Sequence, residues 1–380
     1  MLTSDMSRYA EGVREELLDF IRALAPIPAP SRHEDRRVAF LADALPKLGI
    51  KGAFADDAKN VVIPFGGGDD DDVVVAMAHT DVVFPDEAPL PFSEDDATIR
   101  CPGIGDDTAR LAQLLFAARY FSVRGMRPAR RVVFVANACE EGLGNLAGCR
   151  AVCKAYAGRI RAFVSVDNNA GGAVNVAVGS HRYRVSVATP GGHSWSAFGK
   201  RNAIAEAAGL IDDLYHQRVP VEDGARTTYN VGLVSGGTSV NTIAQDASFL
   251  YEYRSTSRNC LAEMKAAFEA LVNARRRGDV TITVETVGER PCSGDVPRDA
   301  QAALEAMADR ANRAVYGSPL RFSSGSTDAN IPLSLGIPAL TIGSTAAHGA
   351  HTRGEWLEKD SLVPGLAFLI AFLSDFCQMK

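Results

Sequence analysis

The sequence predicts an α/β protein in which a mixed, largely parallel sheet is flanked by helices and carries a smaller inserted domain. Short, β-branched apolar runs alternate with helical patterns in the first half of the chain. This character changes near Gly179 and returns after about Arg298. At 380 residues the chain also exceeds what one hydrophobic core usually serves, so two domains are expected.

The first half of the chain opens with helical patterns over residues 9–24 and 34–48. The first one stops before Pro26, because proline favours extended backbone around it. Apolar runs too short for helices follow and predict buried strands, at 73–77, 132–135, 163–166 and 339–342. Helical patterns at 108–121 and 146–156 separate the first three runs, as expected for a parallel sheet with crossover helices.

The middle of the chain has a different order of elements. Strands are expected at 181–188, 227–234, 247–253 and 280–284, with helices at 203–217 and 261–275. A β-α-β-β-α-β order is typical of a ferredoxin-like α+β sandwich. We therefore expect residues 1–178 and 295–380 to form one domain and residues 179–294 the insertion.

Composition excludes several classes of protein. A net charge of −6 argues against a nucleic-acid partner, which usually meets a basic face. No run approaches the roughly 20 apolar residues of a membrane span, and the N-terminus lacks the pattern of a secretory signal. The seven cysteines are odd in number and sparse, which indicates free thiols in a reducing compartment. We expect a cytoplasmic protein without membrane contact.

The strand expected at 73–77 leads directly into His79-Thr80-Asp81. In extended backbone, residues i and i+2 share a face, so His79 and Asp81 can stand side by side. A metal-bound imidazole commonly donates its second N–H to a carboxylate, and Asp81 fits that role. A single His-x-Asp pair is not specific on its own.

Acids and histidines also follow the other expected strands. Each alone could be a solvated turn or a helix cap, but ligands in open α/β sheets gather at the carboxyl ends of strands. Mixed imidazole and carboxylate groups suit zinc, with cobalt or manganese as substitutes, and a shared carboxylate is typical of two-metal hydrolases. These candidates are Asp106 and Asp107 in a glycine-rich turn, Glu140 and Glu141, Asp167, and His348 or His351.

These residues stand in motifs that resemble the zinc peptidase family of peptidase T, carboxypeptidase G, aminoacylase and succinyl-diaminopimelate desuccinylase. The resemblance spans nearly the whole chain. Its motifs are Ile27-Pro28-Ala29-Pro30-Ser31, Ala78-His79-Thr80-Asp81, Gly105-Asp106-Asp107, Glu140-Glu141-Gly142-Leu143-Gly144, Pro190-Gly191-Gly192-His193-Ser194 and Ala350-His351-Thr352-Arg353-Gly354-Glu355-Trp356.

The resemblance implies two zinc ions per chain and a role for each matched residue. Asp106 would bridge both metals, His79 and Asp167 would complete one site, and Glu141 and His351 the other. Glu140 would be the general base and Asp81 would orient His79. One departure stands out: Thr108-Ala109 replaces the Lys-Gly of many relatives, which puts a local contact at the helix start in doubt.

The resemblance also implies that the insertion is a lid and a homodimer surface. His193, Asn241 and Arg254 match positions that bind substrate, although each could instead be structural, as a turn residue or part of a lid salt bridge. Trp195 and its apolar neighbours favour the dimer only weakly.

Three functions remain open. The first is a peptidase T-like exopeptidase that cleaves amide bonds in short peptides. The second keeps the site but hydrolyses an N-acyl amino acid or a carboxypeptidase substrate. The third is an inactive binding homologue, which loss of a ligand or of the base would signal; both are present in this sequence.

Overall fold

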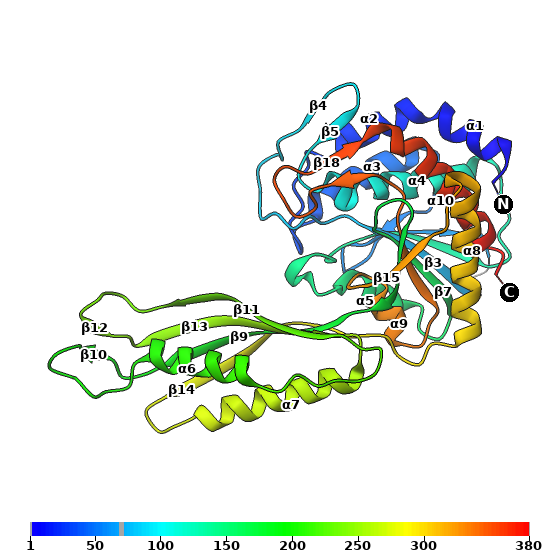
Figure 1. Cartoon of the computed structure of the whole chain (residues 1–380). Coiled ribbons are helices and arrows are strands. Elements are labelled where there is room, and N and C mark those ends of the chain that lie inside the picture. Colours follow the sequence, from blue (N-terminus) through cyan, green and yellow to red (C-terminus); the bar gives the residue numbers. More distant parts are fainter. Residues whose placement is uncertain (1, 68–71, 380) are drawn as a thin grey trace. The chain divides into compact units, whose positions relative to one another are not determined.

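The computed structural model describes residues 2–67 and 72–379 and divides the chain into two compact units (Figure 1). Unit 1 comprises Met1–Ala177 and Gly294–Lys380, and unit 2 comprises Val178–Ser293. Within the described ranges, no helix is both long and apolar enough to cross a bilayer.

Unit 1 is built on an eight-stranded mixed sheet. Its order is β1-β2-β6-β3-β7-β16-β8-β15, and the four consecutive strands β6, β3, β7 and β16 run parallel. The strands are β1 (Phe54–Ala55), β2 (Val61–Phe65), β3 (Val73–His79), β6 (Arg131–Asn137), β7 (Ile160–Val166), β8 (Gly172–Ala177), β15 (Arg321–Gly325) and β16 (Ala339–Ile342). The predicted fold class is confirmed, and every expected strand of this sheet is present.

Helices cover both faces of this sheet. Val74 and Ala76 of β3 belong to the core under α1, α2, α3, α4, α8 and α10, whereas Val73, Val75 and Met77 belong to a second core under α5 and α9. Alternate residues of a strand point to opposite faces, so the unit has three layers. The helices are α1 (Ser4–Gly12), α2 (Arg14–Leu24), α3 (Asp35–Lys47), α4 (Ala109–Val123), α5 (Ala147–Ala155), α8 (Arg298–Tyr316), α9 (Asn330–Ser334) and α10 (Leu362–Phe376).

The single helix expected at residues 9–24 is wrong in detail. Two helices, α1 and α2, meet at Val13, whose φ of −102° and ψ of 8° interrupt the helix. The first helix also begins earlier than expected, because the Thr3 side chain accepts a hydrogen bond from the Met6 N–H and caps it.

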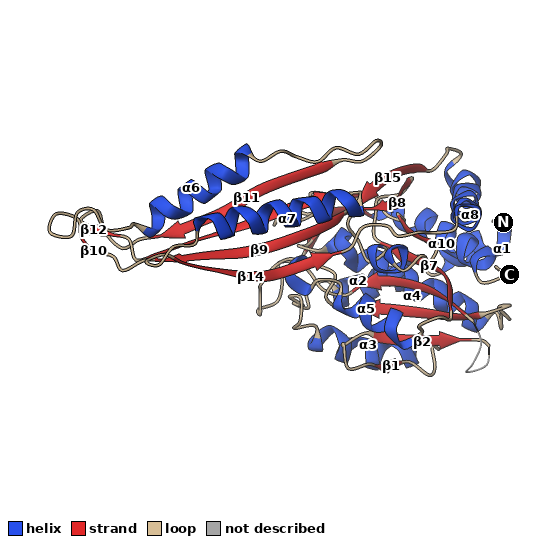
Figure 2. Cartoon of the chain, turned by 90° about the horizontal axis from the view of Figure 1, so that it is seen from below, coloured by secondary structure: helices blue, strands red, loops and turns tan. Residues whose placement is uncertain are grey.

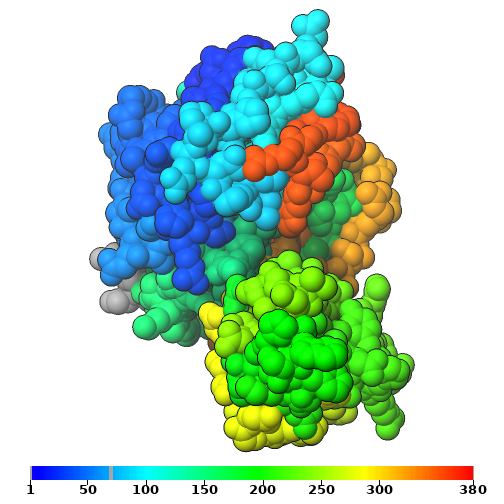
Figure 3. All heavy atoms as spheres, turned by 90° about the vertical axis from the view of Figure 1, so that its left-hand side faces the viewer, coloured from blue at the N-terminus to red at the C-terminus, as the bar shows by residue number. Residues whose placement is uncertain are grey.

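A small antiparallel sheet joins segments of unit 1 that are far apart in sequence. Its strands are β4 (Ser93–Glu94), β5 (Thr98–Arg100), β17 (Ala347–His348) and β18 (Trp356–Glu358). In Figure 3 the cyan residues of β4 and β5 lie beside the orange-red residues of β17 and β18. This sheet anchors both ends of the loop that carries His351.

Unit 2 is a four-stranded antiparallel sheet in the order β11-β13-β9-β14. Helices α6 and α7 cover one face, as Figures 1 and 2 show, and bury Phe249, Tyr251 and Tyr253 against it. A two-stranded ribbon, β10-β12, extends from it. The elements are β9 (Gly179–Ala188), β10 (Gly192–His193), α6 (Ala203–His216), β11 (Thr227–Gly236), β12 (Thr242–Ile243), β13 (Asp246–Ser255), α7 (Arg258–Arg275) and β14 (Thr281–Arg290).

Candidate metal centre

His79 is the last residue of β3, and Asp81 holds its ring in place. The Nδ1 atom of His79 lies 3.0 Å from the Asp81 carbonyl oxygen and 3.5 Å from Oδ1 of the same residue. Both side chains are fully buried. Burial opposes ionisation, but the hydrogen bonds with His79, Ser31 and the Glu141 N–H, together with the charge of His79, outweigh it and lower the pKa of Asp81. Nε2 of His79 is therefore left to face the centre of the site.

Asp81 also connects the ends of two neighbouring strands. Its Oδ1 accepts a hydrogen bond from the Glu140 N–H at 3.0 Å, and its Oδ2 accepts one from the Glu141 N–H at 2.9 Å. Ser31 donates from Oγ to the same Oδ2 at 2.6 Å and to the Glu141 carbonyl at 3.0 Å. The loop after β6 is thus fixed against the end of β3.

The carboxylate of Asp106 lies between two histidines. Its Oδ1 is 3.0 Å from Nε2 of His79, and its Oδ2 is 3.2 Å from Nε2 of His351. The same Nε2 of His351 is 3.1 Å from Oε1 of Glu141. Ligands of a tetrahedral zinc, each about 2.0–2.1 Å from the metal, lie about 3.3 Å from one another. These separations therefore fit a carboxylate shared by two cations.

Among the residues that the structure describes, three groups of side chains have candidate ligand atoms within 4.8 Å of one another. Together the groups contain all five predicted ligands, which come from the end of β3, from the loops after β6 and β7, and from two segments beside the small antiparallel sheet. The groups are His79 with Glu140 and Glu141, His79 with Asp107 and Asp167, and Asp106 with Glu141 and His351.

The raised pKa values of several acids and histidines in this cluster indicate a site that favours cation binding. Burial raises the pKa of Asp107 and of Asp167 well above the usual value, and for Asp167 the neighbouring carboxylates of Asp106 and Asp107 add to this. Hydrogen bonds with Asp106 and Glu141 raise the pKa of His351 to about 11. Burial disfavours a charged His79, yet bonds with Asp106 and Asp81 raise its pKa as well. A site that attracts protons this strongly suits divalent cations, which compete with protons for the same atoms.

Glu140 lies beside this cluster and is 5% exposed. The backbone N–H of Glu140 donates a hydrogen bond to Asp81. The carboxylate of Glu140 has an oxygen within 4.8 Å of candidate ligand atoms of His79 and Glu141. This position allows a carboxylate to exchange protons with a molecule in the site.

Glu355 supports the loop of Asp106, a contact that the sequence reasoning missed. Its carboxylate accepts hydrogen bonds from the backbone N–H groups of Gly103 at 2.8 Å, Gly105 at 2.7 Å and Asp106 at 2.9 Å. Burial and the nearby Asp106 carboxylate raise the pKa of Glu355 to about 7. A Cβ on Gly105 would lie 2.2 Å from the Cβ of Ala347, so the turn needs glycine there. The only sequence signal was the position of Glu355 in the last motif.

Thr108, where the sequence departs from many relatives, contacts a buried arginine. Arg37 of α3 donates from Nη1 to Oγ1 of Thr108 at 3.0 Å and to the Thr80 carbonyl at 2.9 Å. One guanidinium thus joins the loop of His79 to the loop of Asp106.

The three predicted substrate-binding residues lie in unit 2. His193 and Asn241 are exposed neighbours on the ribbon, where the Ser194 N–H donates to the Asn241 carbonyl at 3.0 Å. Arg254 is not with them: it lies near the other end of β13, about 26 Å along the strand from Asp246 at the usual rise. There it donates to both oxygens of Glu252, at 3.0 and 3.1 Å.

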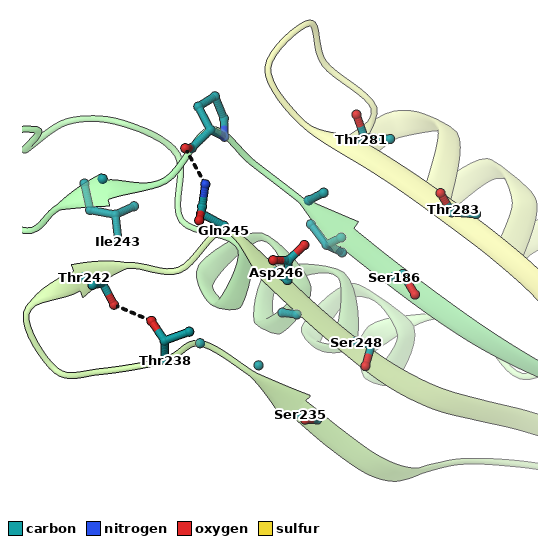
Figure 4. A pocket seen from close by; sticks show the side chains of 17 residues that line it. Ser186, Ser235, Thr238, Thr242, Ile243, Gln245, Asp246, Ser248, Thr281 and Thr283 are labelled. Carbon is teal, nitrogen blue, oxygen red and sulfur yellow. Dashed lines mark hydrogen bonds between the residues drawn. The ribbon is translucent and has the colours of Figure 1, made fainter.

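The uncovered face of the unit 2 sheet carries a hollow of about 590 Å³ (Figure 4). Hydroxyl groups of Ser235, Ser248, Ser186 and Thr283 form a row across its four strands. Among the described residues that line it, one is a carboxylate, Asp246, and none is an imidazole or thiol. The hollow therefore lacks the groups for hydrolysis that the unit 1 cluster offers.

Sequence comparison relates the chain to known hydrolases. The profile of peptidase family M20/M25/M40 matches residues 75–375. A Bacillus subtilis protein, YqjE, is 24% identical over 379 residues, which cover 95% of this chain and 98% of that protein. Acetylornithine deacetylase of Myxococcus xanthus is 25% identical over 340 residues, or 85% of this chain and 87% of the enzyme.

Solved structures share the fold over almost the full length. A tripeptidase from Staphylococcus aureus aligns with a TM-score of 0.76 and 22% identity, covering 96% of this chain and 98% of that one. Aminopeptidase PepT from Bacillus cereus aligns with a TM-score of 0.71 and 22% identity, covering 95% and 98%. The YXEP protein of Bacillus subtilis, a dinuclear metal-binding peptidase, aligns with a TM-score of 0.65 and 17% identity, covering 96% and 99%.

Proposed function

The chain belongs to peptidase family M20/M25/M40, and from that premise we propose that it is a dinuclear metal-dependent exopeptidase that hydrolyses short peptides. The observation that carries this proposal is the placement of Asp106, whose two carboxylate oxygens each face a different histidine. A carboxylate in that position suits two cations that act on one substrate.

The donor set fits two zinc ions. His79 and Asp167 would hold one, Glu141 and His351 the other, and Asp106 both; cobalt or manganese suits the same atoms. When bound, the ions would acidify an attacking water and polarise the scissile carbonyl.

The protein itself would supply proton transfer and orientation. Glu140 would accept the proton of the attacking water on its carboxylate and pass it to the nitrogen of the leaving amine. Asp81 would keep His79 in the tautomer whose Nε2 lone pair faces the site, and would hold the Glu140 backbone still through its N–H. The contacts of Asp81 with His79 at the end of β3 and with the Glu140 and Glu141 N–H groups after β6 support these two roles.

We assign unit 2 the role of lid and dimer surface. Arg254 would bind a carboxylate of the substrate, for which a planar guanidinium is well suited. His193 and Asn241 lie at the other end of the sheet, so His193 would reach the substrate of the partner copy, with Asn241 beside it on the same ribbon. Trp195 and Phe198 are 88% and 91% exposed in the single chain, which supports burial against a second copy. The protein would work in the cytoplasm.

Short peptides are the first substrate class, because a tripeptidase and an aminopeptidase share the fold at the TM-scores given above. The second candidate is an N-acyl amino acid, supported by the similarity to an acetylornithine deacetylase. Both classes have an amide bond for the same site to cleave.

Kinetics on a panel of tripeptides and N-acetyl amino acids, with zinc or manganese supplied, tests this function. We expect hydrolysis of tripeptides with a free amino end, and a loss of about 100-fold or more in kcat for Glu140→Gln with metal content unchanged. Glu87→Gln, which changes an exposed carboxylate of unit 1, is the matched control and should keep full activity. A Glu140→Gln enzyme with unaltered kcat would contradict the assignment.

A further inference from the structure

Arg110 is a buried cation in the first turn of α4, next to the metal cluster. It is 6% exposed and makes four polar contacts through its guanidinium. Nε donates to Oγ1 of Thr345 at 3.2 Å, and Nη2 donates to Oδ1 of Asn169 at 3.1 Å. Nη1 donates to Oδ1 of Asp167 at 3.3 Å and lies 3.5 Å from Oδ1 of Asp107. The guanidinium is therefore locked in one place beside two acids of the site.

Arg110 contacts only one of the two proposed metal sites, which we call the half of His79 and Asp167 and the half of Glu141 and His351. In the half of His79 and Asp167, the guanidinium of Arg110 lies against both local acids, Asp167 and Asp107. In the other half, the acid Glu141 lies against the imidazole of His351 instead of an arginine. Glu140 groups with both His79 and Glu141, so it belongs to neither half alone. The two halves thus differ in the fixed positive charge that lies beside one of them.

The contacts of Arg110 also restrict which oxygens can serve as ligands. Oδ1 of Asp167 is engaged by Nη1, so its Oδ2 is the atom left for a cation. Asp107 groups with His79 and Asp167 as a candidate ligand, but its Oδ2 accepts the His79 N–H at 3.0 Å and its Oδ1 faces Arg110. One oxygen of Asp107 thus accepts a hydrogen bond from the protein, and the other faces the positive charge of Arg110 without accepting a hydrogen bond.

We propose that Arg110 is a positioning residue that makes the two metal sites unequal. It engages one oxygen of Asp167 and places a fixed positive charge beside Asp107, and so weakens cation binding in the half of His79 and Asp167. This inference rests on the proposed dinuclear function. The first cation then binds to the half of Glu141 and His351, and the second binds more weakly beside the fixed positive charge of Arg110.

Zinc titration of the chelator-treated full-length chain, followed by calorimetry, tests this inference without an activity assay. We expect two dissociation constants in the wild type. Arg110→Gln removes the positive charge, so the larger dissociation constant should fall by about tenfold or more. The smaller dissociation constant should stay within about threefold of its wild-type value. A weaker constant that is unchanged, or that weakens further, would overturn the proposal.

Three further variants test whether the charge of Arg110 or its packing is responsible, and show which of the two metal sites binds its cation more weakly. Arg110→Lys keeps the charge and should leave the weaker constant within about threefold of the wild type; a gain equal to that of Arg110→Gln would contradict the charge argument. Arg119→Gln makes the same charge change on the same helix, where Arg119 pairs with Glu16, and should alter neither constant. Asp167→Asn should abolish the weaker binding event and keep the stronger one; loss of the stronger event would overturn the proposal.

These outcomes also distinguish the inference from its premise. A wild-type chain that binds no divalent cation would refute the proposed function itself, whereas two bound ions with equal constants in the wild type would refute the role of Arg110 alone. Circular dichroism checks that Arg110→Gln folds, and Asp167→Asn supplies an independent test if it does not.

Discussion

The metal cluster of unit 1 and the ribbon of unit 2 both present histidines, but in opposite settings. His79 is fully buried, with Asp81 on one ring nitrogen and Asp106 on the other. His193 is exposed, and the contact of its ring is the Trp195 N–H, 3.2 Å from Nδ1. One histidine is held inside the fold, and the other is exposed on the ribbon.

This contrast separates two demands on a hydrolase. Groups that hold cations and transfer protons need fixed positions, and the candidate residues for these roles lie beside a sheet whose strands are packed on both faces. Groups that recognise substrates tolerate exposure, because they gain their contacts when the substrate binds. Substitutions that break the buried contacts of the metal-site loops should therefore affect stability and metal content together, and substitutions on the ribbon should affect turnover alone.

The largest expected effect comes from Glu355→Ala. The change leaves three backbone N–H groups near Asp106 without their acceptor, so we expect a loss of about 3 kcal/mol or more in the free energy of unfolding. Zinc content should fall as well, because the loop of Asp106 loses its anchor. Denaturant unfolding and elemental analysis measure the two effects.

Glu358→Ala is the matched control for this prediction. Glu358 contacts His348 at 2.8 Å, but both side chains are nearly half exposed, at 47% and 46%. We expect a change of about 0.5 kcal/mol or less and full metal content. If Glu355→Ala behaved in the same way, the claim that buried contacts hold the metal loops would be wrong.

A smaller effect is expected from His193→Ala. We predict that kcat/KM falls by about 10- to 100-fold, since a substrate contact is lost, while zinc content is unchanged and stability moves by about 0.5 kcal/mol or less. Steady-state kinetics and thermal unfolding of the same preparation test this. His216→Ala, at an exposed histidine of α6, should leave both quantities at the wild-type value. Loss of metal or of stability in His193→Ala would remove the contrast between the two regions.

Much of unit 1 could be predicted from local sequence patterns. The apolar run 73–77 and the i, i+2 spacing of His79 and Asp81 depend on strand geometry alone, and the structure places both side chains as that geometry requires. Parallel strands bring their carboxyl ends to one edge of the sheet, so Glu141 and Asp167 could be grouped with His79 before any distance was known.

Contacts between distant loops could not be predicted in this way. Arg37 and Arg110 are charged residues in helices that otherwise pack against the core, and their partners at Thr80, Thr108 and Asp167 are set by how the helices cross the sheet. The helix break at Val13 was missed because amphipathic periodicity continues across it. Periodicity reports which face is buried, and tertiary packing decides where a buried charge finds its partner.

The most direct measurement is a crystal structure of the zinc-supplemented protein with anomalous diffraction at the zinc edge. Our account predicts two anomalous peaks in unit 1, one near His79 and Asp167 and one near Glu141 and His351, with the Asp106 carboxylate between them and in contact with both. A single peak, or two peaks with Asp106 turned away from either ion, would contradict it.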